Sequence, residues 1–500
     1  MTRPLAPAGG ASIEPEVMSD IAARAARSDF ARFEAQLRSS GFCARPVRLV
    51  GHVARCDGRG RQRVWSTDTE PDGILRKACG NRREAVCPPC AERYRQDAYH
   101  LIAAGLRGGK GVPDAVVEHP AVFVTFTAPS FGLVHTRPIG ADGEPRRCRP
   151  RRDAPICEHG VRLSCGQVHD DDESRLGEPI CPDCFDYGGA VIWNNVLGEL
   201  WRRTVPVYLP RVLARQIGVT QTRLREQVRV AYAKIAEYQR RGLVHLHAVI
   251  RLDRAMPDYR ADQLRPPDAR FTAQLLEDAL RATVAEVSVP VADELGSGRV
   301  CWGEQLDIRQ LDVTARREVA GYLAKYATKS TEQAGSVPHR VTEHQVDALP
   351  VREHVRAYMR KAFRLHADRA LAERRFGSCA HALGYRGHCL TKSRRYSTTF
   401  KALREAREQH VHEQILARSH DAAQRALAGA VERIASFAYV GQGHITAGDA
   451  FLAASAAARA REQSRIAREE LSWPRNRAED QGAAGADGSG VLVAAGGKGR

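Results

Sequence analysis

Two histidines on one face of an expected β-strand are the residues of this sequence best suited to metal chemistry. His245 and His247 flank Leu246 in an apolar run, and successive strand side chains point to opposite faces. Their imidazoles would therefore lie side by side, with Glu237 eight residues upstream as a carboxylate ligand. Two imidazoles and one carboxylate with open positions favour Mg²⁺ or Mn²⁺ over a closed zinc site. Such an ion could bind a phosphodiester oxygen and neutralise its charge.

A second reactive group falls on the helix expected at residues 316–329. Tyr322 and Tyr326 are four residues apart, and so are Lys325 and Lys329, so each pair shares a helical face. A tyrosine hydroxyl can attack a metal-bound phosphodiester and form a covalent phosphotyrosine, while lysines offset phenolate or phosphate charge. Taken singly, a His-x-His strand and a tyrosine pair are more often parts of a packed core. Their occurrence together in a basic chain favours chemistry.

Thirteen cysteines, most of them in two clusters, indicate structural zinc. In each cluster a Cys-x-x-Cys pair follows two more distant cysteines, which is a typical zinc spacing. The expected ligands are Cys56, Cys79, Cys87 and Cys90 in the first cluster, with Cys43 as an alternative, and Cys157, Cys165, Cys181 and Cys184 in the second, with Cys148, His159 and His169 competing. We expect one or two structural Zn²⁺ ions that hold together segments poor in apolar residues. A looser group, Cys379, His381, His388 and Cys389, lacks a strong zinc spacing.

The charge of the chain favours a polyanionic partner. Its 500 residues carry a formal charge of +17, with a pI near 9.5, and most cations are arginines, whose planar fork suits phosphate. An arginine-rich composition inherited from a GC-rich genome is the alternative. The run Lys392, Arg394, Arg395 and Tyr396 combines cations with an aromatic ring, which could contact phosphates and stack on a base, or form a solvated basic loop. No apolar stretch is long enough to span a membrane and no signal pattern begins the chain, so we expect a cytoplasmic protein without a membrane partner.

Three segments resemble the motifs of HUH endonucleases, in the same order. The strand at residues 123–127 is similar to the first motif, residues 237–247 resemble the second with its histidine pair, and residues 322–329 resemble the two-tyrosine third motif. This superfamily includes rolling-circle replication initiators, conjugative relaxases and some transposases. Over residues 40–460 the chain resembles the replication initiators of actinobacterial plasmids and integrative elements. The phrases that carry this closer resemblance are Cys87-Pro88-Pro89-Cys90, residues 126–132, Cys181-Pro182-Asp183-Cys184 and residues 391–397.

The resemblance implies an α+β fold, in which a central antiparallel sheet, the palm of HUH nucleases, is flanked by helices and carries zinc-binding inserts. It implies a protein that nicks and rejoins origin DNA, single-stranded or melted, to start rolling-circle replication, with a host helicase and polymerase as partners. In the family's terms, Tyr326 is the first choice of nucleophile and Tyr322 the second. A transposase or relaxase with the same chemistry, and a non-enzymatic zinc-containing DNA-binding regulator, are the alternatives.

We expect five segments along the chain. An N-terminal helix occupies residues 1–42, and a cysteine-rich zinc module with a helix occupies residues 43–115. The nuclease domain is expected at residues 116–335, with a zinc insert at 145–190 and with strands at 122–127, 228–252 and 304–311. A basic and helical region at residues 336–475 and a disordered tail at 476–500 complete the chain.

Overall fold

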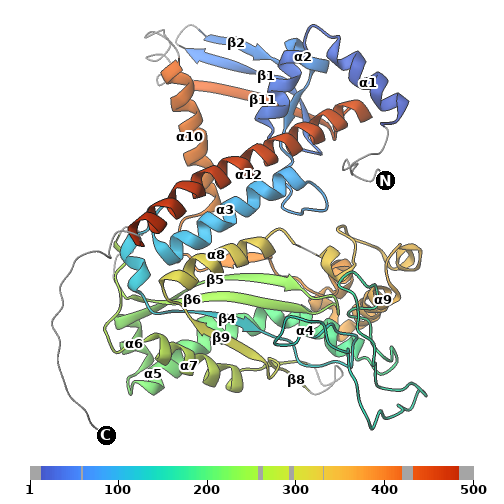
Figure 1. Ribbon diagram of the computed structural model, residues 1–500, viewed down its shortest axis with the longest axis vertical. Helices are drawn as coiled ribbons and strands as arrows, with labels where there is room; N and C mark the ends of the chain where they lie inside the picture. Colours follow the sequence, from blue (N-terminus) through green and yellow to red (C-terminus); the bar gives the residue numbers. More distant parts are fainter. Residues whose placement is uncertain are drawn as a thin grey trace, which may run out of the picture. The chain divides into compact units, whose positions relative to one another are not determined.

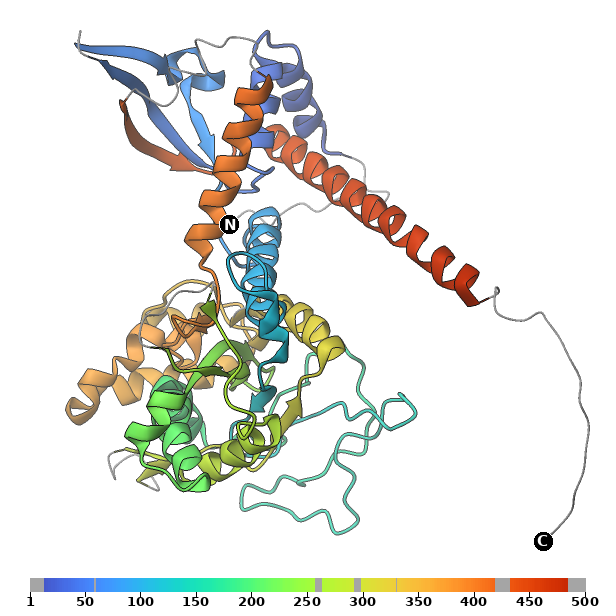
Figure 2. The same ribbon diagram turned by 90° about the vertical axis from the view of Figure 1, so that its left-hand side faces the viewer.

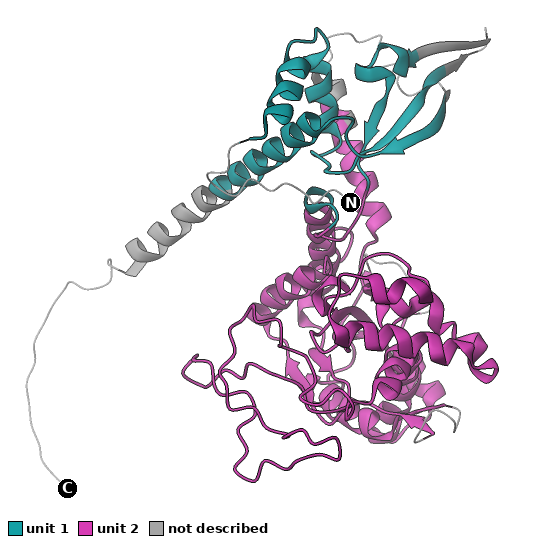
Figure 3. Ribbon diagram, turned by 90° about the vertical axis from the view of Figure 1, so that its right-hand side faces the viewer, with its two compact units in different colours: residues 1–79, 86–90, 428–500 teal, residues 80–85, 91–427 magenta. Residues whose placement is uncertain are grey.

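The chain forms two compact units. The computed structural model describes residues 13–57, 60–256, 263–291, 298–329, 331–418 and 432–483. The first unit comprises residues 1–79, 86–90 and 428–500, and the second comprises residues 80–85 and 91–427 (Figure 3). No helix in the described ranges has both the length and the apolar character needed to cross a membrane.

The first unit joins the two ends of the chain in one small sheet. Its strands β1 (Val47–Asp57), β2 (Gly60–Ser66), β3 (Leu75–Lys77) and β11 (Glu432–Gln442) are arranged with β1 between β11 and β2, and β3 also pairs with β1. Helices α1 (Pro15–Ala25), α2 (Phe30–Ser39) and α12 (Ala447–Ala483) complete it. The buried Arg24 of α1 ties these segments together, because its guanidinium donates to Asp449 at 2.7 Å and to Asp72 at 2.9 Å.

Three expectations for these segments need correction. The single N-terminal helix is two helices, α1 and α2. Strand β11 lies in a region expected to be helical, because its extended form comes from pairing with β1, which local periodicity does not reveal. Helix α12 continues to Ala483, into the predicted disordered tail, whereas residues 484–500 lie outside the described part of the chain.

The second unit is built on a five-stranded antiparallel sheet (Figure 1). The strand order is β10 (Leu390–Lys392), β5 (Val228–Tyr238), β6 (Val244–Arg254), β4 (Ala121–Phe126) and β9 (Leu306–Gln310). The predicted β5–β6 hairpin is confirmed. Gly242 in its turn has φ +85°, and a Cβ there would meet the ring of Tyr358 at 2.7 Å, so only glycine fits. The mixed α+β class is therefore confirmed.

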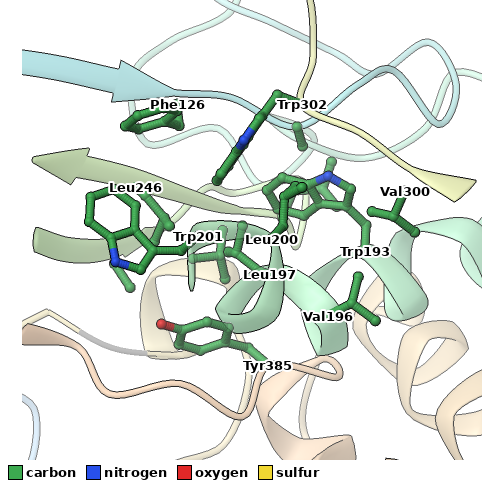
Figure 4. Packing of buried hydrophobic residues seen from close by; sticks show 14 of the residues in the cluster. Phe126, Trp193, Val196, Leu197, Leu200, Trp201, Leu246, Val300, Trp302 and Tyr385 are labelled. Atoms are coloured by element: carbon green, nitrogen blue, oxygen red, sulfur yellow. The ribbon is translucent and has the colours of Figure 1, made fainter. Parts of the chain in front are cut away.

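Side chains along each strand alternate between the two faces of the sheet, so the core of this unit has two layers. Phe126 and Leu246 point to the face covered by α4 (Tyr187–Arg202), where Trp193, Trp201 and Trp302 pack against them (Figure 4). The opposite face contributes Phe123, Ile235 and Val249, which pack against α8 (Val313–Tyr326) and α3 (Pro88–Arg107). The further helices and strands of this unit are α5 (Leu209–Gln216), α6 (Gln221–Gln227), α7 (Ala273–Glu286), β7 (Val289–Pro290), β8 (Arg299–Val300), α9 (Glu353–Ala367) and α10 (Phe400–Arg418).

A long insert separates β4 from α4. Residues 133–186 contain no helix or extended strand (Figure 2). Isolated bridges such as Arg149–Cys165 and Val134–Pro179 connect the loops. So few backbone hydrogen bonds between the loops cannot by themselves order a segment of this length. The insert therefore needs another source of order, which its cysteine and histidine side chains can supply.

Candidate active site and metal centres

The sheet register brings the predicted metal ligands to one face. His245 lies opposite Glu237 of β5, and His247 lies opposite Thr125 of β4. The His247 ring uses both nitrogens, because Nε2 is 2.6 Å from Glu237 Oε2 and Nδ1 is 3.0 Å from Thr125 Oγ1. The carboxylate and the hydroxyl therefore fix the orientation of this imidazole from two neighbouring strands.

His245 remains unpaired beside this network. Its ring centre is 6.4 Å from that of His247, and its Nε2 atom is buried without a hydrogen-bond partner. Burial lowers the pKa of His245 to about 3, and the nearby Arg241 and His247 contribute to the same shift. The ring is neutral at ordinary pH, so a lone pair is available to a cation.

Helix α8 brings both tyrosines to the histidine pair. The Asp312 carboxylate caps the helix by accepting from the Ala315 amide at 2.8 Å. The Tyr326 ring stacks on His247 with centres 5.5 Å apart, and the Tyr322 ring meets His247 edge-on at 5.6 Å. Burial raises the pKa of Tyr322, and contact with Tyr326 adds to the rise.

The two lysines of the helix differ in position. Lys329 Nζ lies 5.0 Å from the centre of the Tyr326 ring, in a cation–π contact, whereas Lys325 is exposed on the helix surface. Of the two, Lys329 is therefore the one placed to act on a charge at Tyr326.

His245, His247 and Glu237 suit a divalent ion by their chemistry. In the structure His247 and Glu237 are hydrogen-bonded to each other, and His245 stands beside them. An unpaired, buried imidazole nitrogen next to a His–Glu pair fits a ligand role, and nitrogen and carboxylate oxygen ligands suit Mn²⁺ or Mg²⁺. Within the described ranges, these three residues are not among the groups whose donor atoms all lie within 4.8 Å of one another. The Glu237–His247 hydrogen bond must open for both residues to bind one ion through these atoms.

Two residues of the site were not predicted as site residues. Thr125 bonds His247, and the Phe123 ring lies 5.8 Å from Tyr322 and 6.1 Å from His247. Both lie on β4, two residues apart, so their side chains point to the same face of the sheet beside the histidine strand. This shared face was the signal in the sequence that could have identified them. Their partners depend on the register between β4 and β6, which the sequence does not give.

The structure forms three four-ligand clusters, grouped differently from the predicted sets. Cys43, Cys79, Cys87 and Cys90 form the first, in the first unit, while the side chain of Cys56 lies outside the described residues. The insert carries the other two, which are His135, Cys148, Cys165 and His169, and Cys157, His159, Cys181 and Cys184. Cys165 therefore belongs to a different cluster from Cys157, because the loops of the insert alternate between the two sites.

The spacing of the ligand atoms fits tetrahedral zinc. With Zn–S near 2.3 Å and Zn–N near 2.05 Å, the ligand atoms of a tetrahedron lie roughly 3.3–3.8 Å apart. The Cys43 sulfur is 3.7 Å from that of Cys87, and the Cys165 sulfur is 3.5 Å from His169 Nε2. The other ring nitrogen of His169 is 2.7 Å from Glu173, a common support for a metal-bound histidine. These clusters could hold metal ions such as zinc.

The basic run at residues 392–396 is only partly accessible. Lys392, Arg394 and Arg395 line a cavity of about 560 Å³ together with Arg229 and Arg254. Tyr396, by contrast, is fully buried, and its hydroxyl donates to the Ile102 carbonyl at 3.0 Å. The expectation that Tyr396 stacks on a base therefore does not fit the structure, because its ring fills the core between β6 and α3.

The looser cysteine–histidine group does not form a metal centre among the described residues. Cys379 is buried and contacts the side chain of Asn195, and the Cys389 sulfur lies 3.9 Å from the Tyr94 hydroxyl. With His381, these cysteines line a cavity instead.

Comparisons with known proteins agree with one another. Residues 29–458 match the RepSA family, described as "Replication initiator protein, pSAM2". A curated protein from Streptomyces ambofaciens, named "Replication initiator protein", is 39% identical over 470 residues, which cover 89% of this chain and 94% of that protein. No solved structure matches the chain. The chain therefore belongs to the RepSA family of replication initiator proteins.

Proposed function

We propose that this replication initiator nicks and rejoins one strand of its origin DNA, with Tyr326 as the first nucleophile and Tyr322 as the second. The observation that supports this proposal is the stacking of Tyr326 on His247, which is itself bonded to Glu237. A phenol beside two imidazoles and a carboxylate has the groups that phosphodiester transfer needs.

The reaction exchanges one phosphodiester bond of the DNA for a phosphodiester bond to tyrosine. The tyrosine oxygen bonds to phosphorus, the bond between phosphorus and the 3′ oxygen breaks, and the proton gained by that oxygen balances the one lost by the phenol. The products are a 5′-phosphotyrosine and a 3′ hydroxyl that can prime synthesis. His245, His247 and Glu237 would hold a Mg²⁺ or Mn²⁺ ion, and this ion would offset part of the negative charge on the attacked phosphate.

The remaining residues act on the nucleophiles. Lys329 over the Tyr326 ring favours negative charge on that phenol, and Thr125 keeps His247 oriented. Because the Tyr322 and Tyr326 rings are only 4.8 Å apart, one can hold the 5′ end while the other cleaves at the close of a replication round. We also propose a rolling-circle mode with a host helicase and polymerase as partners, which the 3′ hydroxyl left by the nick would support.

The test is covalent trapping. The protein is incubated with Mn²⁺ and single-stranded oligonucleotides that tile the origin region and the ends of its own element, and adducts are separated under denaturing conditions. We expect Tyr326→Phe to remove most of the adduct and the Tyr322→Phe, Tyr326→Phe double variant to remove all of it. Tyr439→Phe, at an exposed position of β11, is the matched control and should form the adduct at the parent level. Omission of the divalent ion should abolish the adduct.

An unchanged adduct level in the double tyrosine variant would contradict the proposal. Sequence-specific DNA binding without any adduct in the parent would instead indicate a non-enzymatic DNA-binding regulator. Adducts at the ends of the element, and not at its origin, would indicate a transposase.

We also propose that three structural zinc ions occupy the three clusters, and that the cavity at Lys392, Arg394 and Arg395 contacts origin DNA. The ligand distances support the first proposal, and the collected cations support the second. Closed thiolate and imidazole sites hold zinc tightly and leave no open position, so these ions would not take part in the nicking step.

A further inference from the structure

A strongly cationic cavity lies beside the end of β5 in the second unit. Its volume is about 620 Å³, within the usual range of roughly 300–1,000 Å³ for ligand pockets. Six cationic side chains line it, namely Arg82, Arg83, Lys329, Arg340, Arg375 and Arg386, and no aspartate or glutamate among the described residues does. A concave surface of one charge sign concentrates counter-ions of the other sign.

Three of these cations are held in place by backbone carbonyls, which leaves their charge in place. Arg82 donates to the carbonyls of Ala327 at 3.3 Å and Lys329 at 3.0 Å, at the end of α8. Arg83 donates to the Pro338 carbonyl, and Arg386 donates to the Arg374 carbonyl at 3.1 Å. None of the six forms an ion pair with a carboxylate in the described ranges, so their charge remains available to an anion.

The cavity adjoins the candidate active site. Tyr238 and Lys329 line both this cavity and a neighbouring one of about 740 Å³ that contains Glu237. Lys329 also lies over the ring of Tyr326. The neighbouring cavity is also lined by Asp172, Glu173 and Glu332, so a strand attacked at Tyr326 would avoid these carboxylates by passing over Lys329 directly into the cationic cavity.

The second cationic cavity, at Lys392 and Arg394, has a different location. It contacts β5 at residues 228–232, and Glu237 lies five residues or more further along the strand, or about 17 Å at roughly 3.3 Å per residue. The cavity at Arg340 and Arg375 shares Lys329 with the candidate active site and the cavity at Lys392 and Arg394 does not, so the two cavities cannot serve the same phosphates.

We propose that the cavity lined by Arg82, Arg83, Lys329, Arg340, Arg375 and Arg386 binds successive phosphates of the DNA single strand next to the scissile phosphate. Arginine forks bind phosphate oxygens in pairs and retain their charge at all physiological pH values. The half-buried His381, whose Nδ1 is buried and unpaired, adds a further polar group to the wall. This inference rests on the proposed nicking function, because it identifies where the substrate strand runs.

The experiment measures the salt dependence of single-strand binding. A fluorescent mixed-sequence oligonucleotide is titrated with the Tyr322→Phe, Tyr326→Phe protein, which cannot form an adduct, at several salt concentrations. Arg340→Gln and Arg375→Gln are then added, because both side chains are exposed and donate no hydrogen bond to a described residue. The control adds Arg223→Gln and Arg281→Gln, which remove the same charge from exposed positions on α6 and α7.

Each phosphate contact contributes about −0.7 to the slope of log K against log salt for a single strand. Loss of two contacts should therefore reduce the magnitude of the slope by about 1.4 and weaken binding at 0.1 M salt about tenfold or more. The control pair should leave the slope within error of the parent. Equal slopes for the cavity pair and the control pair, with melting temperatures unchanged, would overturn the proposal.

A competitor identifies the source of the phosphate. Inorganic phosphate should displace the oligonucleotide only at far higher concentration than an unlabelled strand, because it engages fewer cations. Tight competition by inorganic phosphate would assign the cavity to a free phosphate and overturn the strand assignment. The slope does not depend on nicking, so absence of the adduct in the parent together with a reduced slope in the cavity variant would refute the nuclease proposal alone.

Discussion

At the scale of single residues, the His247 imidazole is fixed by two bonds, to Glu237 and to Thr125. Groups that orient a metal-ligating histidine typically matter about 10- to 100-fold for metal affinity or activity. We predict that Thr125→Val raises the Mn²⁺ concentration needed for half-maximal adduct formation by that factor. The measurement is a Mn²⁺ titration of the trapping assay.

Thr127→Val is the control for Thr125→Val, because Thr127 bonds the Gln305 carbonyl and not a site residue. It should leave the Mn²⁺ requirement unchanged even if it lowers the melting temperature. An equal shift in both variants would show that Thr125 acts through stability alone.

Lys234 is a second residue with a measurable effect, because its ammonium group is buried against the Trp201 ring at 5.2 Å. Burial lowers the pKa of Lys234 from 10.5 to about 8. Between about pH 8 and 10.5 the unfolded chain holds a proton that the folded chain has lost, so this group makes the free energy of unfolding rise with pH in that window. Below about pH 8 both states hold the proton, and the folded state bears the cost of a buried charge.

We predict that Lys234→Met raises the melting temperature at pH 7 and removes the part of the stability increase above pH 8 that comes from Lys234. Loss of the cation–π contact, about 1–2 kcal/mol, opposes the gain from relieving the buried charge. Thermal melts of parent and variant across pH 6–10 provide the measurement. Identical pH profiles would show that Lys234 is better solvated than its burial indicates.

At the scale of elements, the insert at residues 133–186 depends on its ligands because it contains no helix or extended strand. We predict that Cys148→Ser lowers the zinc content of the purified protein from three ions to two or fewer, and makes the insert sensitive to limited proteolysis. Elemental analysis and mass mapping of the cleavage sites measure both effects. Cys301→Ser, at an exposed cysteine outside the clusters, should retain all three ions.

The sequence indicated the elements of the site well and the zinc groupings less well. Strands β4, β5 and β6 and helix α8 have strong local periodicity, so their positions and the shared face of His245 and His247 follow from alternation alone. Which cysteines share an ion depends on how irregular loops cross, and loops without periodicity carry no such information. His135 is a clear example, because the cysteine nearest to it in the sequence, Cys148, is 13 residues away.

At the scale of the whole molecule, the long-range pairings were beyond prediction. The pairing of Val47 with Gln442 builds the sheet of the first unit from the two ends of the chain. Local patterns describe each strand but not its partner, so segments that need a remote partner were expected to be helix or loop. The second unit was easier to predict because its central hairpin is formed by neighbours in sequence.

Both units contribute to the basic character of the chain, but the cations of the second unit are gathered into cavities. Arg340 and Arg375 follow Tyr326 by 14 and 49 residues and line the same cavity as Lys329. The spacing of these residues in the sequence does not reveal the shared cavity, because the segments at residues 82–83, 338–340 and 375–389 converge only when the sheet and α8 are in place. Net charge alone therefore indicated a polyanionic partner but not the part of the protein surface on which that partner would bind.

The ligands of the insert alternate in pairs along the chain, since His135 and Cys148 belong to one cluster, Cys157 and His159 to the other, Cys165 and His169 again to the first, and Cys181 and Cys184 to the second. A zinc ion at the first cluster closes a loop that already contains half of the second. Loop closure for the second ion then costs less entropy, so the two ions should load cooperatively. In a cell short of zinc, most copies of the initiator would have either both ions of the insert or neither, so the supply of competent initiator would respond sharply to zinc.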